Sequence, residues 1–296
     1  MMFSREGIRF EDAAKTVEHD LAVLHAHNPR LTDWYLAQVE YRQGLMYVEW
    51  GDIERGYPLV IKAVESPEWR VQGSGSDWWG LNSAVYAQSQ SDRVADAEPQ
   101  ARRMIEIGKE WQKGDDLGNS YYPLASALMH ARRYAQAEAT LAQFDALPGV
   151  AAGLAKDREA HETPNEVRMV VALERGDAKS VLGLTEHLSA KEGVHDDEDA
   201  WLSRAAALCE TRDYVGGLAL FERWLPRLAT DRYEASPKVA YWRARTGLCE
   251  LKAGHVHKAI EASNLANKAI AIQPRVSPHY KAPVLELAAS VKPYRR

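Results

Sequence analysis

The residues of this chain whose types are best suited to binding are two pairs of adjacent aromatics and one acidic run. Carboxylates in a run attract basic partners and divalent cations, and exposed Trp and Tyr side chains are enriched in binding hot spots. Their residue types therefore predict contact with a binding partner. The candidate partner-binding residues are Trp78, Trp79, Tyr121, Tyr122, Asp196, Asp197, Glu198 and Asp199.

Each of these features also has a purely structural explanation. The acidic run directly precedes a helix expected to begin near Ala200, and acidic side chains are favoured at the positive end of a helix. Adjacent residues on a helix point about 100° apart, so usually only one ring of each aromatic pair can face the core. Both rings can also fill the groove between neighbouring helices. The sequence leaves the binding and structural interpretations open.

Signals for catalysis and for metal binding are absent. The chain lacks the Walker-type phosphate loop, the HExxH pattern and the GxSxG pattern. His255 and His257 lie at an expected turn with no cysteine or carboxylate at a fixed spacing, which favours two solvated residues over a metal site. We therefore expect no catalytic residues, no metal and no cofactor.

Composition and charge exclude several classes of partner. The net charge is −5, and no Lys/Arg cluster is longer than a dipeptide, which disfavours nucleic acid. No stretch approaches the ~20 apolar residues that span a bilayer, so no membrane partner is expected. Cys209 and Cys249 fall in apolar helical segments, which is typical of buried, reduced cysteines. These features predict a cytoplasmic protein.

Five short windows along the chain share one pattern. Each begins with Gly or Arg, carries an apolar residue third, mostly ends on a small residue, and lies between two amphipathic helical stretches. This is the pattern of a repeated helical-hairpin turn, because glycine ends a helix without steric cost. The windows begin at Gly51, Arg132, Gly176, Arg212 and Gly254.

The spacing of the windows predicts one array of hairpins with a period near ~40 residues. The first gap is about two periods long, so a degraded hairpin is expected between Ser76 and Gly114. We predict an all-α, right-handed solenoid of stacked antiparallel hairpins that forms a single domain. Its predicted parts are an N-terminal capping segment (1–30), about six hairpins (31–274) and a C-terminal capping helix with a tail (275–296).

The hairpins resemble tetratricopeptide repeats. The first unit matches the family pattern of small and aromatic positions at Gly44, Tyr47, Gly51, Ala63 and Pro67. The spacing exceeds the family's 34 residues, and two turns carry Arg where the family has Gly. The resemblance implies stacked hairpins whose first helices line a concave surface that binds a protein or peptide.

The function expected from this surface is non-enzymatic binding of a protein partner. The chain also resembles, in general character, the all-helical immunity proteins of polymorphic bacterial toxin systems. That resemblance implies a cytoplasmic inhibitor that neutralises a toxin or effector. Two alternatives stay open. One is an (α/α)-type carbohydrate-active enzyme, which would require paired carboxylates. The other is a peptide-binding regulatory sensor.

Overall fold

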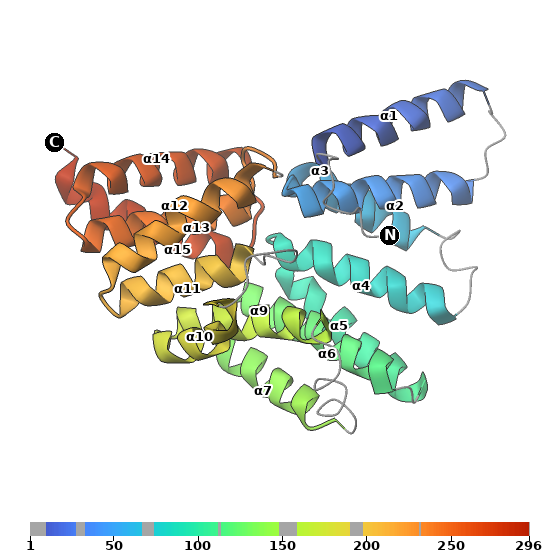
Figure 1. The fold of residues 1–296 in the computed structure, drawn as a ribbon. Coiled ribbons are helices and arrows are strands. Elements are labelled where there is room, and N and C mark those ends of the chain that lie inside the picture. Colours follow the sequence, from blue (N-terminus) through green and yellow to red (C-terminus); the bar gives the residue numbers. More distant parts are fainter. Residues whose placement is uncertain are drawn as a thin grey trace.

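The computed structural model describes residues 10–27, 33–66, 74–111, 114–147, 159–189, 198–230 and 232–295. Within these ranges the protein is all-α, and its one β-type pairing is an isolated bridge between Ser91 and Val276 (Figure 1). The helices are α1 (Phe10–His27), α2 (Asp33–Trp50), α3 (Ile53–Glu65), α4 (Ser74–Gln90), α5 (Val94–Trp111), α6 (Gly114–His130), α7 (Tyr134–Asp145), α9 (Glu159–Glu174), α10 (Ala178–Leu184), α11 (Glu198–Glu210), α12 (Tyr214–Thr230), α13 (Pro237–Lys252), α14 (Val256–Ile272) and α15 (Pro278–Val291).

Successive helices pack as pairs, of which α2 with α3, α11 with α12 and α13 with α14 are the most extensive. The expected degraded unit is present as α4 and α5, and α15 occupies the position expected for the C-terminal cap. The handedness of the array and the antiparallel stacking of its pairs stay predictions.

The five repeated windows form one recurring turn. Their first residues are the positions with positive φ among the described residues: Gly51 (99°), Arg132 (61°), Gly176 (77°), Arg212 (69°) and Gly254 (88°). In each turn the next residue's N–H donates to the carbonyl five positions earlier, as Asp52 does to Tyr47 at 2.8 Å and Arg133 does to Leu128 at 2.8 Å. This is the Schellman ending, which satisfies the last carbonyls of the first helix.

Small residues follow most of these turns because the paired helices touch there. A Cβ added to Gly56 would lie 2.7 Å from the Gly44 carbonyl oxygen and 2.7 Å from the Val48 nitrogen, which no side chain tolerates. The equivalent Ala137 and Ala259 have no exposed surface. Close backbone contact at the start of the second helix therefore requires the small residue of the repeat pattern, in addition to the conformation of the turn.

Interactions between distant segments join the early helices to the last ones. The Gln273 side-chain amide accepts from the Ile53 N–H (2.7 Å) and donates to the carbonyls of Gly51 (2.6 Å) and Ala235 (2.7 Å). A second junction lies at the α4–α5 turn, where the Asp92 N–H donates to Arg275 (2.6 Å). The array therefore returns on itself, with the α2–α3 and α4–α5 turns held against the loops that precede α13 and α15 (Figure 1).

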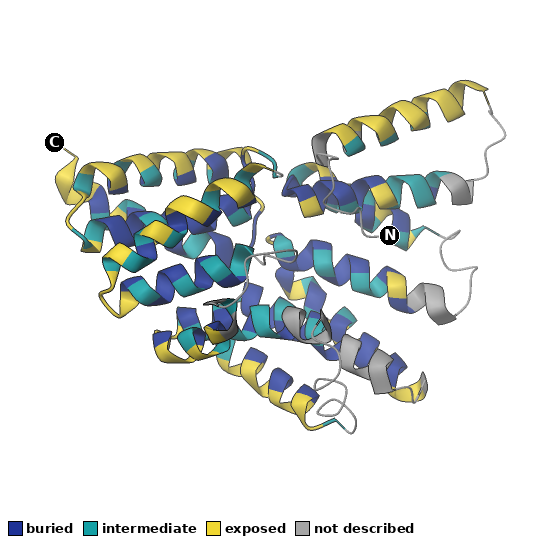
Figure 2. Cartoon of the chain, in the orientation of Figure 1, coloured by how far each residue is buried: buried dark blue, intermediate teal, exposed yellow. Residues whose placement is uncertain are grey.

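The core is richest in aromatic side chains where the C-terminal pairs stack. Trp224 and Trp242 are fully buried, and Trp201 lies parallel to Trp224 with ring centroids 5.3 Å apart. Burial follows the faces of the helices that meet other helices, whereas α1 and one face of α14 are largely exposed (Figure 2).

The interpretation of the two cysteines as reduced is wrong for this structure. Cys209 on α11 and Cys249 on α13 form a disulfide with a Cα–Cα separation of 5.6 Å. Their helices are neighbours in the array, which brings two buried thiols from consecutive units together. Disulfides persist in oxidising compartments, so the cysteines no longer support a cytoplasmic location. Within the described ranges, no helix combines the length and apolar character that crossing a bilayer requires.

Candidate functional site

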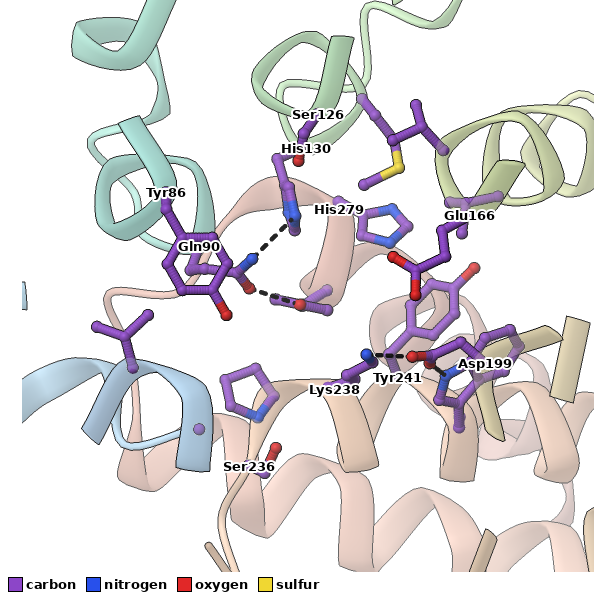
Figure 3. A pocket seen from close by; sticks show the side chains of 18 of the residues that line it. Tyr86, Gln90, Ser126, His130, Glu166, Asp199, Ser236, Lys238, Tyr241 and His279 are labelled. Atoms are coloured by element: carbon purple, nitrogen blue, oxygen red, sulfur yellow. Dashed lines mark hydrogen bonds and ion pairs between the residues drawn. The ribbon is translucent and has the colours of Figure 1, made fainter. Parts of the chain in front are cut away.

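A cavity of about 270 Å³ lies where the inner helices converge. Its lining residues come from α2, α4, α6, α9, α11, α13 and α15, together with the first residue of α3, the turn after α2 and the loop before α13. Six of these are the first helices of their pairs, and α15 is the last helix of the array. Figure 3 shows the polar side chains that point into this space from four sides. The position agrees with the expectation that first helices form the inner surface.

A partly buried ion pair forms one wall. Lys238, in the first turn of α13, pairs with Asp199, and the Trp242 indole N–H donates to the same carboxylate at 2.9 Å (Figure 3). Burial alone would raise the pKa of Asp199, but Lys238 outweighs it and lowers that pKa. Burial likewise opposes the charge of Lys238, yet Asp199 raises its pKa above the usual value. Both groups therefore stay charged inside the protein.

A chain of hydrogen bonds fixes the opposite wall. The Tyr280 hydroxyl donates to Gln90 Oε1 (2.6 Å), and the Gln90 amide nitrogen lies 3.4 Å from His130 Nε2. Because the amide can only donate, His130 Nε2 accepts and its Nδ1–H donates to Ser277 Oγ (3.0 Å). Burial lowers the pKa of His130 well below its ordinary value, so this histidine is neutral. The chain connects α4, α6 and α15 around the cavity.

Three polar groups of the lining have no hydrogen-bond partner within the described part of the chain. They are Ser203 Oγ, Ser236 Oγ and His279 Nδ1, and all three residues are buried. Burial and the nearby Arg245 and Arg132 lower the pKa of His279 to about 3, so its ring is neutral. Buried polar groups are almost always paired. A cluster of three around one cavity marks a place where a bound molecule would complete the hydrogen bonding.

A further buried ion pair supports the cavity wall from behind. Arg245 pairs with Glu174, and the hydroxyl of Tyr241 donates to the same carboxylate at 2.8 Å. Tyr134 reaches the other carboxylate oxygen at 3.3 Å. Tyr241 lines the cavity with its ring, so these bonds hold an aromatic surface in place.

The two aromatic pairs predicted from the sequence point in different directions. Trp78 is buried and its indole donates to Ser120 Oγ at 3.0 Å, and Tyr121 is buried with it in the core between helices. Trp79 is 59% exposed on α4. Tyr122 lines the cavity. The structure therefore brings only Tyr122 of these four rings to the cavity.

The acidic run is divided between described and undescribed parts of the chain. Asp196 and Asp197 lie outside the described residues. Glu198 and Asp199 occupy the first turn of α11, where helix capping was one of the two expectations. Asp199 also reaches the cavity, so it belongs to a site as well as to a helix start.

Several lining residues were not identified from the sequence. Glu166, Lys238, His130 and His279 stand alone in their segments, and no spacing rule connects them. The one local signal was the Ser–Pro pair that opens both α13 and α15, Ser236–Pro237 and Ser277–Pro278, which marks two helix starts. In the described residues no group of three His, Cys, Asp or Glu side chains is placed to hold a metal.

Comparison with known proteins adds no family assignment. No protein-family model matches this sequence, and a search of curated proteins finds no match.

Proposed function

We propose that this protein is a non-enzymatic binding scaffold that holds a protein or peptide partner on the surface formed by its inner helices. The observation that supports this most is the convergence of all the first helices from α2 to α13 on one cavity. Stacked hairpins that share a concave inner surface bind partners there. In this proposal the pairs stack antiparallel in a right-handed curve, as in tetratricopeptide repeats.

The most specific form of the proposal is an inhibitor that neutralises a toxin or effector. Its support is the general resemblance to helical immunity proteins and the acidic run, which would attract a basic partner and whose Asp199 lines the cavity. A partner segment entering from the inner surface would meet Tyr122 and the Asp199–Lys238 pair. Trp79, which is exposed on α4, would contact the partner outside the cavity.

The test begins with identification of a partner from the native source, followed by binding kinetics with purified variants. Tyr122→Ala and Trp79→Ala should each weaken binding by about 2 kcal/mol if the ring is a hot spot. Replacing Asp196 and Asp197 together by Asn should mainly slow association and reduce its salt dependence. Val215→Ala is the matched control, because Val215 is 85% exposed on α12 and does not line the cavity. Equal affinity for all variants would place the partner elsewhere.

A carbohydrate-active enzyme is the second candidate, and one observation favours it. The carboxylates of Glu166 and Asp199 reach the same cavity, which also has aromatic walls (Figure 3). Glycoside hydrolysis needs two carboxylates on opposite sides of the bond that is cleaved. Turnover of an oligosaccharide that is abolished by Glu166→Gln, with the fold intact by circular dichroism, would replace the binding-scaffold proposal.

A further inference from the structure

The cavity has the size of a small cyclic ligand. Its volume of about 270 Å³ exceeds the ~150 Å³ of a protein cavity that accepts a benzene ring. It approaches the lower end of ordinary ligand pockets, which begin near ~300 Å³. The space therefore accommodates one six-membered ring with substituents.

The lining selects against an apolar ligand. Ser203 Oγ, Ser236 Oγ and His279 Nδ1 have no partner among the described residues, and an apolar molecule would leave them so. An unpaired buried polar group destabilises the protein, and a ligand that pairs it recovers that loss. The Tyr86 hydroxyl points into the same space (Figure 3).

The lining also selects against a charged ligand. Asp199 and Lys238 already neutralise one another, so a cation or an anion bound beside them would compete with an existing partner. Glu49, Glu166 and Arg232 also line the cavity, where Arg232 stabilises the charge of Glu49 and Glu166 stabilises that of Lys238. Ser203, Ser236, Tyr86 and His279 are the neutral polar groups of the lining. Hydroxyls both donate and accept, and a neutral imidazole nitrogen does one or the other. Their complement is a set of ligand hydroxyls.

We propose that the central cavity binds a neutral, polyhydroxylated ring of about monosaccharide size. Ligand hydroxyls complete the hydrogen bonding of Ser203, His279 and Tyr86. The Asp199 carboxylate accepts further hydrogen bonds from the ligand, and the Lys238 ammonium donates them. The ring of Tyr122 offers a flat apolar surface to the C–H face of the ligand. The ligand shares Tyr122 and the Asp199–Lys238 pair with the proposed partner surface, so the two would compete for the cavity, but binding of the ligand to the chain alone does not depend on a partner.

The experiment is a titration of the full chain with methyl β-glucopyranoside, methyl β-galactopyranoside and myo-inositol, followed by saturation-transfer NMR and calorimetry. Three ring compounds serve as controls: glucosamine carries a cation, glucuronate carries an anion, and cyclohexanol lacks the additional hydroxyls. At least one neutral polyol should bind saturably, and the controls should bind at least about tenfold more weakly. Absence of binding of all three polyols at about 10 mM would overturn the proposal, as would tighter binding of glucosamine or glucuronate.

Variants locate the site within the cavity. Tyr86→Phe and Ser203→Ala each remove one hydroxyl and should weaken binding of the polyol about five- to tenfold. Tyr41→Phe is the matched control, since its buried hydroxyl bonds Ser83 (2.6 Å) outside the cavity. Equal affinity in all three variants would overturn the location. Hydrolysis of a disaccharide would support the proposed ligand class, but it would overturn the proposal that the protein is not an enzyme.

Discussion

Gln273 donates a hydrogen bond to the carbonyl of Gly51 across 222 positions of the chain. The same amide group also bonds Ile53 and Ala235, so one buried side chain ties together the end of α2, the start of α3 and the loop before α13. Gly51 has a positive φ, and a Cβ there would lie 2.5 Å from Ser236 Oγ. The junction thus depends on a glycine that allows close approach and on a side chain that pairs three buried backbone groups.

Gln273→Leu should destabilise the protein strongly, because it leaves three buried backbone groups without partners. Each such group costs about 1–3 kcal/mol, so a loss of at least about 3 kcal/mol in the free energy of unfolding is expected. Urea unfolding followed by circular dichroism measures it. Gln136→Leu is the control, since Gln136 is exposed and its bond to Arg133 lies at the surface. Similar losses in both variants would contradict the role of the junction.

Arg212→Gly should stabilise the protein. Arg212 adopts φ 69°, a left-handed conformation that costs a non-glycine residue roughly 1–2 kcal/mol. Glycine also loses more chain entropy on folding, so the expected net gain is about 0.5–1 kcal/mol. The control is Lys268→Gly in the exposed part of α14, where glycine should cost about 1 kcal/mol. Thermal melts of the two variants should therefore shift in opposite directions.

The sequence predicted the helices and turns well because those features are local. Apolar spacing, the window pattern and the small residue after each turn all act within a few residues, and the positive φ of Arg132 and Arg212 occurs where the pattern required it. The sequence did not reveal why the turn of the degraded unit, between α4 and α5, departs from the repeat pattern. Its turn, at Ser91 and Asp92, lacks a left-handed residue and instead bonds Arg275 and Val276 from the far end of the chain.

The cavity could not be predicted from the sequence because the contacts that form it are not local. Its key pairs join residues far apart in the chain, such as His130 with Ser277, separated by 147 positions. Periodicity identifies which face of a helix is buried, but not which distant helix faces it. The disulfide illustrates a missed signal of intermediate range, because Cys209 and Cys249 lie one repeat apart in neighbouring first helices.

The free energy of unfolding should fall as the pH decreases from about 6.5. His130 and His279 are neutral in the folded protein because burial lowers their pKa values, that of His279 to about 3. In the unfolded chain both histidines bind protons below about pH 6.5. The unfolded state then binds more protons, so each residue contributes up to about 1.4 kcal/mol of lost stability per pH unit between pH 6.5 and the folded-state pKa.

Urea unfolding between pH 5 and 6.5 measures this dependence, in a range where most carboxylates are ionised in both states. His279→Gln should make the slope shallower by up to about 1.4 kcal/mol per pH unit. His257→Gln is the control, since His257 is exposed on α14. An unchanged slope in His279→Gln would show that this ring is not held neutral.

Ala137→Glu should destabilise the protein by several kcal/mol. Ala137 has no exposed surface and lies in the core cluster formed by α5, α6 and α7, so glutamate would both overpack the contact and bury a charge. Lys179→Glu in the next unit is the matched control, because Lys179 is exposed in the first turn of α10. Thermal melts that tolerate both changes equally would contradict the repeat register.

Removal of the disulfide should lower stability without changing the fold. The Cys209–Cys249 bond closes a loop with a sequence separation of 40 and lies among buried side chains of α11 and α13. Chain-entropy arguments give about 3–4 kcal/mol for a loop of this length. Cys209→Ala with Cys249→Ala should therefore melt at a lower temperature and keep its helical circular dichroism spectrum. Mass spectrometry after alkylation without reductant checks the premise directly, because a bonded pair takes up no alkyl group. Two alkylated cysteines in the native protein, with no change in the melt on adding reductant, would show that α11 and α13 are held together by packing alone.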